Sequence, residues 1–402
     1  MKLPKQYWGL IVCVTLWLVT NFYYPNQDTR QVQFMAWEFG CIFLFAVSQF
    51  FPSLRKNDNP FPALFLGWAV LSCFTHLMQE FTLIGLTQVL MFTFTYYALT
   101  NTLDREICQT IKKCIVLIAV ANVVMGMMQY FGFSPVYDTK EVTGFISQKW
   151  NFGILCAVAL PFAIEWNLLT TVILLVGVAV ADKYACYIPL FLALFLNARV
   201  KTVSRKVSIP VLIAFIFAAM LKKTDFFHES LASLGHGEMS LKVAPRISHW
   251  KEVMHFSFGR PLDGYGFNSF SAYIRSTKAN FVPEMHSEPL QVFFETGAIG
   301  VAIMLGWIVR IWKKSNIMNL DATATSLMIF AVASFFHSCF HAPNILFVFM
   351  IILAMWEVER GSFYAEENSH CGRPDKLSGE AETRTAPRDS VSEVILGSDI
   401  DI

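Results

Sequence analysis

Long apolar segments alternate with short polar segments along most of the chain. Several apolar segments are close to the ~20 residues that a helix needs to cross the hydrocarbon core of a membrane. Lipid offers the backbone no hydrogen-bond partners, so each crossing segment must form a helix. The pattern predicts an all-α, polytopic membrane protein of about twelve transmembrane helices. The predicted spans are 7–24, 32–51, 61–77, 81–100, 113–131, 151–166, 168–181, 184–197, 207–221, 289–312, 322–340 and 343–356.

The cations predict how these spans are oriented. With the N-terminus in the cytoplasm, the short cytoplasmic loops hold fourteen Lys and Arg residues and the short outer loops hold four. Cytoplasmic loops of membrane proteins carry such an excess, so both termini are predicted to be cytoplasmic. A single span over 168–197 would turn the basic run Arg199–Lys206 outward, which favours a hairpin there. Residues 222–288 then form one large outer loop.

Composition agrees with a membrane protein and sets the C-terminal tail apart. The chain is 55% hydrophobic and 15% charged, whereas a soluble domain is about a quarter charged. The N-terminus lacks a small-residue cleavage site, so we interpret it as an uncleaved first span. Residues 1–360 are predicted to form one transmembrane domain. Residues 361–402 are rich in polar side chains and are predicted to be a disordered cytoplasmic tail. The net charge of +1 gives no reason to expect a nucleic acid partner.

The histidines gather on the predicted outer side. His286 stands where the outer loop meets an apolar helix, so that it faces water on one side and lipid on the other. This is a suitable place for a base that acts on a substrate with a lipid tail. Only His370, in the tail, is predicted to be cytoplasmic. The outer histidines are His76, His228, His236, His249, His255, His286, His337 and His341.

Two patterns could hold a metal ion, and neither is favoured. His337 and His341 are four residues apart, which would place them on one helical face, but no Glu accompanies them in a His-Glu-x-x-His arrangement. Packing at the water interface is the preferred interpretation of this pair. The nine cysteines lie mostly in apolar spans and form no Cys-x-x-Cys, so neither disulfides nor a thiolate site are expected.

The outer loop contains a predicted amphipathic helix and a tight turn. Residues 246–258 have apolar side chains at helical spacing, and Arg246 begins the helix near the positive end of its dipole. Arg246 is therefore either a solvated residue or an anion clamp. Gly264 and Gly266 allow a tight turn and close approach to a ligand. Glu295, one to two turns into the next span, is expected to cap or brace neighbouring backbone.

Several of these residues together resemble a known family. The run from His286 to Gly300 resembles the His-Asn-x-x-Leu-Gln…Glu-x-Gly-x-x-Gly signature of the O-antigen ligase and polymerase superfamily. Arg246…Trp250 followed by Pro261-Leu-x-Gly264-x-Gly266 looks like the upstream segment of that superfamily, and Asn151 with Pro161 is similar to its Asn-rich start of a middle span. The resemblance covers about residues 145–310.

Two positions depart from the pattern of the superfamily. Ser287 replaces the usual Asn, and Asp182-Lys183 replaces Ser-Arg at the outer hairpin tip. Lys183 retains the positive charge of the arginine but loses its planar two-pronged contact with phosphate.

The resemblance implies a glycosyltransferase of lipopolysaccharide biosynthesis in the bacterial inner membrane. It would move a glycan from undecaprenyl diphosphate to a hydroxyl of a glycolipid acceptor, lipid A–core, on the periplasmic face. His286 would act as general base, while Arg246 and Lys183 stabilise the departing diphosphate. Asn151, Gly264 and Gly266 would bind substrate. No cofactor or metal is implied, the anomeric carbon would be inverted, and the expected partners are donor, acceptor and membrane lipids.

Other functions remain open at this point. A polymerase that extends the glycan and an oligosaccharyltransferase that modifies protein belong to the same superfamily, and the sequence does not separate them. A lipid or glycan transporter without chemistry is an alternative of another class. No internal repeat is evident in the sequence, which argues against many transporter folds.

Overall fold

The computed structural model describes a helical chain, with every regular element in its described part an α-helix. The chain divides into two compact units, residues 1–362 and 363–402, and the described residues of the second are the helical 363–370. The described residues are 5–21, 40, 59–74, 80–133, 142–146, 149–181, 186–188, 190–191, 244–270, 273, 285–314, 321–337, 339 and 342–370.

The helices of the first unit coincide with most of the predicted spans. The predicted spans at 32–51 and 207–221, and most of 184–197, lie outside the described residues. The helix predicted at 246–258 is confirmed as α11. The helices are α1 (Lys5–Asn21), α3 (Phe61–Phe74), α4 (Glu80–Thr102), α5 (Arg105–Tyr130), α6 (Lys149–Trp166), α7 (Leu168–Ala181), α11 (Ala244–Ser257), α13 (Glu288–Lys314), α14 (Ala322–Ser334) and α15 (Pro343–His370).

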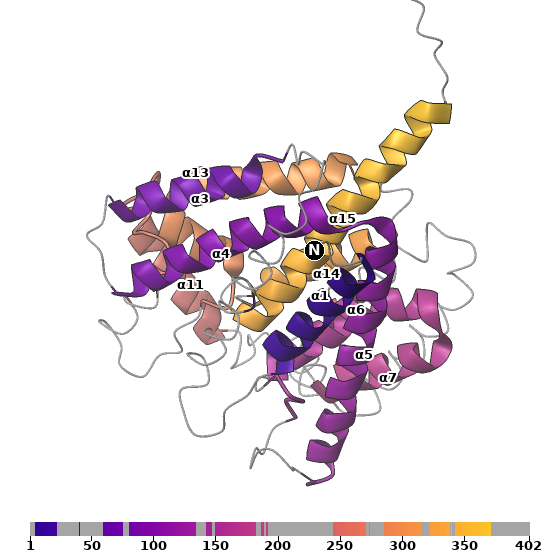
Figure 1. Cartoon of the computed structure of the whole chain (residues 1–402). Helices are drawn as coiled ribbons and strands as arrows, with labels where there is room; N and C mark the ends of the chain where they lie inside the picture. The colour runs from indigo at the N-terminus through magenta and orange to yellow at the C-terminus, as the bar shows by residue number, and fades with distance from the viewer. Residues whose placement is uncertain are drawn as a thin grey trace, which may run out of the picture. The chain divides into compact units, whose positions relative to one another are not determined.

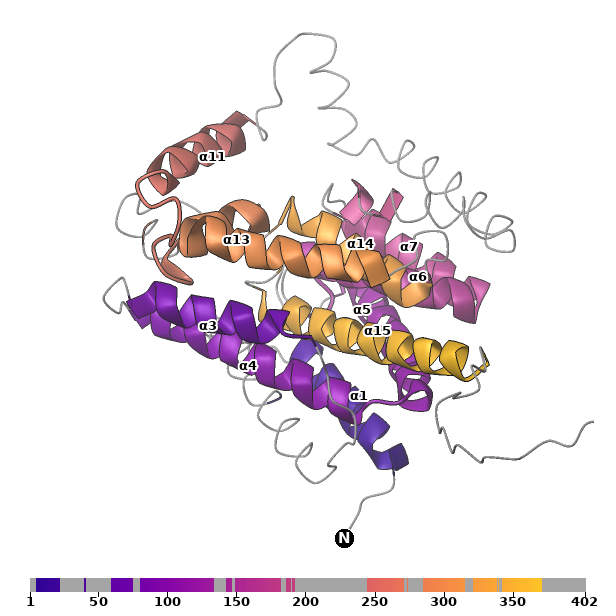
Figure 2. The same cartoon turned by 90° about the horizontal axis from the view of Figure 1, so that it is seen from above.

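Packing within the first unit forms two neighbouring groups of helices. Helix α5 packs against α1, α6 and α7, and α6 also packs against α14 (Figure 1). Helix α3 packs against α4 and α13, and α11 packs against α13 (Figure 2). Helix α13 therefore joins the segment before it, which carries His286, to both α3 and α11.

Two helices in the described part are long and apolar enough to cross a membrane, one over Arg105–Tyr130 and one over Glu288–Ile311. Shorter apolar helices occupy Gly9–Val19, Phe61–Phe74, Leu168–Ala181 and Ala322–Ser334. These helices expose large apolar side chains: Leu117, Val124 and Met128 form an exposed stripe along α5. A helix that is apolar on its exposed side as well as its buried side is typical of a lipid environment.

Polar contacts join the C-terminal half of α15 to its neighbours. Lys112 on α5 forms a 2.7 Å ion pair with Glu359, whose other carboxylate oxygen accepts a 2.7 Å hydrogen bond from Thr323. Arg360 pairs with Asp321 at 3.2 Å, and Asp321 also caps the N-terminus of α14. Glu359 is fifteen residues after Asn344, which places the two about 22 Å apart along α15.

Two predicted boundaries differ from the structure. The span predicted to reach residue 340 ends at Ser334, because the backbone tightens into turns in which Phe336 N–H donates to the Ala333 carbonyl. His337 therefore lies beyond the helix, and the prediction that His337 and His341 share a helical face is wrong. Helix α15 continues to His370, past the predicted start of the tail at 361. The rest of the tail and His341 lie outside the described residues.

Candidate functional site

Helix α13 is broken at Gly297, where φ is 65° and ψ is −169°. The break frees three backbone carbonyls, and each accepts a hydrogen bond from another segment. Tyr265 N–H donates to the Phe294 carbonyl at 3.0 Å, and Gly266 N–H donates to the Glu295 carbonyl at 2.8 Å. The indole N–H of Trp68 on α3 donates to the Thr296 carbonyl at 2.8 Å. The break is therefore satisfied by protein groups, as a span surrounded by lipid requires.

The 261–266 turn also accepts from the second half of the helix. Ala298 N–H donates to the Pro261 carbonyl at 2.8 Å, and Ile299 N–H donates to the Leu262 carbonyl at 3.3 Å. The two backbones lie so close that a Cβ on Gly264 would meet the Glu295 carbonyl at 2.5 Å. A Cβ on Gly297 would likewise overlap the Leu262 carbonyl. We call this set of contacts between residues 261–266 and 294–299 the interlock.

The interlock gives the predicted glycine turn a structural role. Gly264 has a φ of +67° and Gly266 a φ of +94°, which ordinary residues rarely adopt. Both are buried, Gly264 against α13 and Gly266 against Ser72 and Cys73 of α3. The glycines bring backbone close to backbone at this place. Contact of either glycine with a substrate stays a prediction.

His286 lies directly before α13 in a strained backbone conformation. Its φ is +54°, and only one other non-glycine residue in the described part, Asn268, has a positive φ. Such a conformation costs of order 1–3 kcal/mol and is concentrated at functional sites. Trp250 on α11 fixes the preceding peptide, because its indole N–H donates to the Met285 carbonyl at 2.9 Å. The following residue, Ser287, is buried and accepts the first hydrogen bond of α13 from Gln291 N–H at 3.0 Å.

Two other rings lie beside the imidazole of His286. The Trp150 ring, at the start of α6, is 6.2 Å away between centroids with a 28° angle between planes. The His337 ring is 6.0 Å away at 22°, and Trp150 and His337 are 5.3 Å apart at 12°. Trp150 and His286 are half-buried, whereas His337 is buried. The three rings are thus nearly parallel, and two of them reach the surface.

Two asparagines stand behind this ring cluster. Asn151 Oδ1 lies 3.4 Å from His337 Nε2, and Asn151 Nδ2 donates to Asn344 Oδ1 at 3.3 Å. Asn344 Oδ1 also accepts from Ile345 N–H at 2.9 Å, at the start of α15. The contact with Asn151 favours the His337 tautomer with its proton on Nε2. Helix α15 therefore orients Asn151, and Asn151 orients His337.

Two acidic residues come soon after His286 in the sequence. Glu288 and Glu295 are both buried. Gln291 Nε2, one turn before Glu295, donates to its carboxylate oxygen at 3.1 Å, while the backbone carbonyl of Glu295 belongs to the interlock. Glu295 thus helps to hold the N-terminal half of α13.

The structure brings together His286 and Asn151 from among the predicted site residues. Arg246 lies in the first turn of α11, one turn before Trp250 on the same helix, and its side chain lies outside the described part. Lys183 lies outside it as well. Sequence reasoning missed Trp150 and Asn344, and it treated His337 as interface packing or one of two metal ligands. Trp150 directly precedes Asn151, and this adjacency was the available signal.

Among the side chains that the structure describes, no group of three His, Cys, Asp or Glu is placed to hold a metal ion. Metal-independent transfer stays a prediction. No protein-family model and no curated protein matches this chain. The geometry of the ring cluster and the motif residues therefore carry the functional argument.

Proposed function

We propose that this chain is a membrane-embedded glycosyltransferase of the O-antigen ligase type. It transfers a glycan from undecaprenyl diphosphate to a hydroxyl of a glycolipid acceptor, lipid A–core, on the outer face of a bacterial inner membrane. The observation that carries the proposal is the placement of His286: a half-buried imidazole on strained backbone, at the start of a helix long enough to cross a membrane. Trp150 and His337 lie beside the imidazole, with ring centroids 6.2 and 6.0 Å from it.

The reaction needs one proton transfer and one stabilised leaving group. Neutral His286 accepts the proton of the acceptor hydroxyl while the oxygen attacks the anomeric carbon. The bond between that carbon and the diphosphate oxygen breaks, and the polyprenyl diphosphate leaves with the bonding electrons. General base catalysis contributes about 10²–10⁴-fold. Attack opposite the leaving group inverts the anomeric carbon.

Cations on the outer side stabilise the charge that develops on the diphosphate. Arg246 and Lys183 carry this role in the proposal, as the family resemblance implies. Lys149 begins α6 directly before Trp150 and is a further cation close to the ring cluster in the sequence. The reaction therefore proceeds without a metal ion.

His337 and Asn151 act as positioning residues in this scheme. Asn344 and Asn151 hold the His337 ring, and that ring lies alongside His286. The exposed part of the Trp150 ring offers a flat apolar surface beside the imidazole, against which the ring of a sugar can rest. The reacting hydroxyl then lies within reach of His286.

The distribution of charge along the helices supports this orientation in the membrane. Arg310 lies near the C-terminal end of α13, and the apolar helix over Glu288–Ile311 is long enough to cross the hydrocarbon core. Arg310, Lys313, Arg105 and Lys113 lie at the ends of α13 and α5 that are remote from His286. An excess of cations on one side marks that side as cytoplasmic. About twelve spans with both termini in the cytoplasm are part of the proposal.

Two members of the same superfamily share this chemistry: a glycan polymerase and a protein oligosaccharyltransferase. They differ from a ligase in the acceptor alone. A non-catalytic transporter is the alternative of another class, and the break in α13 favours it, because transporters use broken helices to bind ions and substrates. Here, however, the interlock and Trp68 bond the backbone groups of residues 294–296, 298 and 299. This arrangement favours a structural break and thus the transferase.

Purified protein tests the proposal when it is incubated with undecaprenyl-diphosphate glycan and three acceptors: lipid A–core, a second donor glycan and an acceptor peptide. Mass spectrometry then identifies the product. We expect lipid A–core to gain the glycan, His286→Ala to make no product, and the control His370→Ala at the end of α15 to behave as the parent. Folded protein that modifies none of the acceptors, or normal product from His286→Ala, would contradict the proposal.

A further inference from the structure

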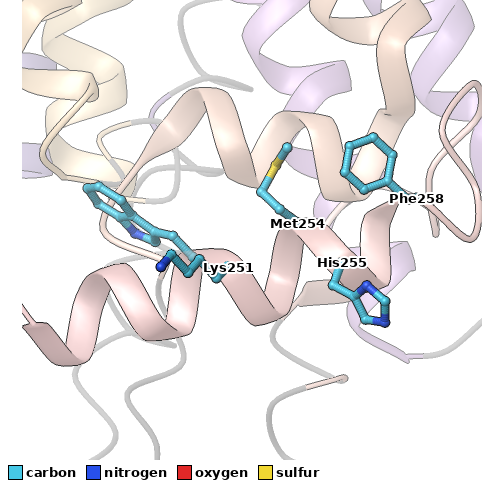
Figure 3. Close-up of a pocket in the computed structure, with 5 residues that line it drawn as sticks. Lys251, Met254, His255 and Phe258 are labelled. Carbon is cyan, nitrogen blue, oxygen red and sulfur yellow. The ribbon is translucent and has the colours of Figure 1, made fainter.

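The proposed reaction leaves two features of the structure without a role. One is a shallow hollow of about 410 Å³ along α11, whose lining side chains expose almost entirely apolar surface (Figure 3). The other is a pair of buried amide side chains on α5, Asn122 and Gln129. The amides make specific polar contacts with residues 142–146, the described segment that leads to Trp150.

Gln129, in the last turn of α5, bonds to the backbone of Thr143 and Gly144. Its Oε1 accepts from Thr143 N–H at 2.8 Å and from Gly144 N–H at 2.9 Å. Its Nε2 donates to the Gly144 carbonyl at 3.1 Å. The two backbone N–H groups require an acceptor, which fixes the orientation of the amide. Gln129, Thr143 and Gly144 are all buried, so these bonds are shielded from water.

Asn122 lies two turns before Gln129 and holds the next residue of the segment. Its Oδ1 accepts from Phe145 N–H at 2.9 Å, and its Nδ2 donates to the Ile118 carbonyl of α5 at 2.9 Å. The N–H groups of three consecutive residues, 143–145, therefore bond to amide side chains of α5. We call these contacts of Asn122 and Gln129 with residues 143–145 the amide clamp.

Two glycines allow the segment to lie this close to α5. Gly144 has a φ of +61°, and a Cβ there would come within 2.8 Å of Asn122 Oδ1. A Cβ on Gly126, on the same face of α5 as Asn122, would come within 3.0 Å of Val142. Either Cβ would also lie 3.0 Å from the ring of Phe152. Phe152 therefore packs against both glycines, and the clamped segment also holds the first turn of α6.

This first turn of α6 carries two residues of the candidate site. Trp150 and Asn151 directly precede Phe152, which is fully buried. The Trp150 ring lies 5.3 Å from the ring of His337, and Asn151 Oδ1 lies 3.4 Å from His337 Nε2. Trp150 also lies beside His286, at 6.2 Å between ring centroids. The amide clamp thus fixes the part of α6 that contacts both histidines.

We propose that Gln129 and Asn122 are positioning residues for the transfer reaction, an inference that rests on the proposed function. Through the amide clamp they hold Trp150 as the flat support for the sugar and Asn151 as the partner of His337. They act through these residues and do not touch the reacting atoms.

Gln129→Leu tests the role of the clamp, because it removes the hydrogen bonds of this side chain and keeps about the same size. The N–H groups of Thr143 and Gly144 would be left buried without an acceptor, so the segment would move away from α5. A displacement of about 1 Å can cost about 10²-fold in rate, and we expect kcat to fall by about 10- to 100-fold. Gln129→Glu keeps the accepting oxygen and loses only the Nε2 donor, so its kcat should be intermediate.

A matched control makes the same substitution elsewhere on the helix. Gln109 is an exposed residue of α5, and Gln109→Leu should transfer glycan as the parent does. Thermal unfolding of each variant sets an assay temperature at which all of them are folded. A loss of rate at that temperature then reflects the site and not the amount of folded protein.

The Trp150 ring provides a measurement that does not depend on transfer. The full-length protein is labelled with fluorotryptophan and purified in detergent, and Trp150→Phe assigns the fluorine NMR resonance of Trp150. This resonance depends on the rings of His286 and His337 beside it. Gln129→Leu should shift or broaden the resonance, Gln129→Glu should do so to a smaller extent, and Gln109→Leu should leave it unchanged.

Two results would overturn the inference: a parent-like Trp150 resonance in folded Gln129→Leu, or transfer by that variant at the parent rate. If Gln129→Leu does not fold, the same two measurements on Gln129→Glu decide. A parent-like resonance alongside normal transfer by the parent removes the clamp and leaves the proposed function. A changed resonance in a protein whose parent transfers no glycan removes the proposed function and leaves the clamp as the support of the ring cluster.

Discussion

Replacing Gly297 by alanine tests the interlock that supports the site. The backbone of Gly297, with φ 65° and ψ −169°, lies in a region that only glycine adopts readily, so alanine costs about 1–3 kcal/mol there. The new Cβ would also overlap the carbonyl of Leu262. The turn must then move, and the hydrogen bonds from Ala298 N–H and Ile299 N–H are lost at about 0.5–1.5 kcal/mol each. The total is about 2–6 kcal/mol.

Thermal unfolding of the purified protein in one detergent measures this loss. A cost of 2 kcal/mol or more lowers Tm by at least about 2 °C, because the entropy of unfolding grows with the length of a 402-residue chain. Two controls separate its causes. Gly132→Ala has a positive φ of +84° but open space around the Cβ, so it carries the backbone cost alone. Gly67→Ala lies in α3 with open space and should be neutral or slightly stabilising.

The expected order of stability is Gly67→Ala, then Gly132→Ala, then Gly297→Ala. Transfer should fall with Gly297→Ala because the N-terminal half of α13 follows directly from His286. If Gly297→Ala unfolds at the temperature of Gly132→Ala, the close contact with Leu262 does not exist and the interlock is wrong.

Three further changes address the site. Trp250→Phe removes the indole hydrogen bond to Met285, and we expect it to lower kcat more than it raises KM for the acceptor, because His286 loses its orientation; steady-state kinetics with unchanged kcat would refute this. Lys183→Arg should keep or raise the rate of transfer, and Lys183→Ala should lower it. If neither variant changes the rate in a transfer assay, Lys183 has no part in the mechanism. EDTA should leave transfer by the purified protein unchanged, and inhibition that added Mg²⁺ or Mn²⁺ reverses would show that a metal ion is required.

The sequence predicted a structural feature correctly where the residues of one segment determine that feature by themselves. Apolar periodicity located α13 and α11, and the spacing of Gly264 and Gly266 indicated a tight turn before α13. The break at Gly297 was not predicted, because apolar residues continue through it and a single glycine is tolerated in a helix. What makes the break is the partner segment at 261–266, and hydrogen bonds between two segments leave no periodic pattern in either.

The ring cluster shows the same limit more clearly. The three rings of the cluster come from separate segments. Trp150 is more than a hundred residues before His286, and His337 is about fifty residues after it, so only packing brings them together. His337 was judged by its spacing to His341, whereas the structure ends α14 at Ser334 and turns His337 toward Asn151. Local spacing therefore did not indicate Asn151 as a neighbour of this histidine.

The role of His286 as the base is tested most directly by His286→Gly with added imidazole. The φ of +54° at this position suits glycine, so this variant removes the side chain without backbone strain. We measure the rate at which the purified variant moves the glycan from undecaprenyl diphosphate to lipid A–core. The account predicts a rate reduced by about 10²-fold or more that imidazole partly restores at neutral pH. Transfer at the parent rate by His286→Gly, with or without imidazole, would contradict it.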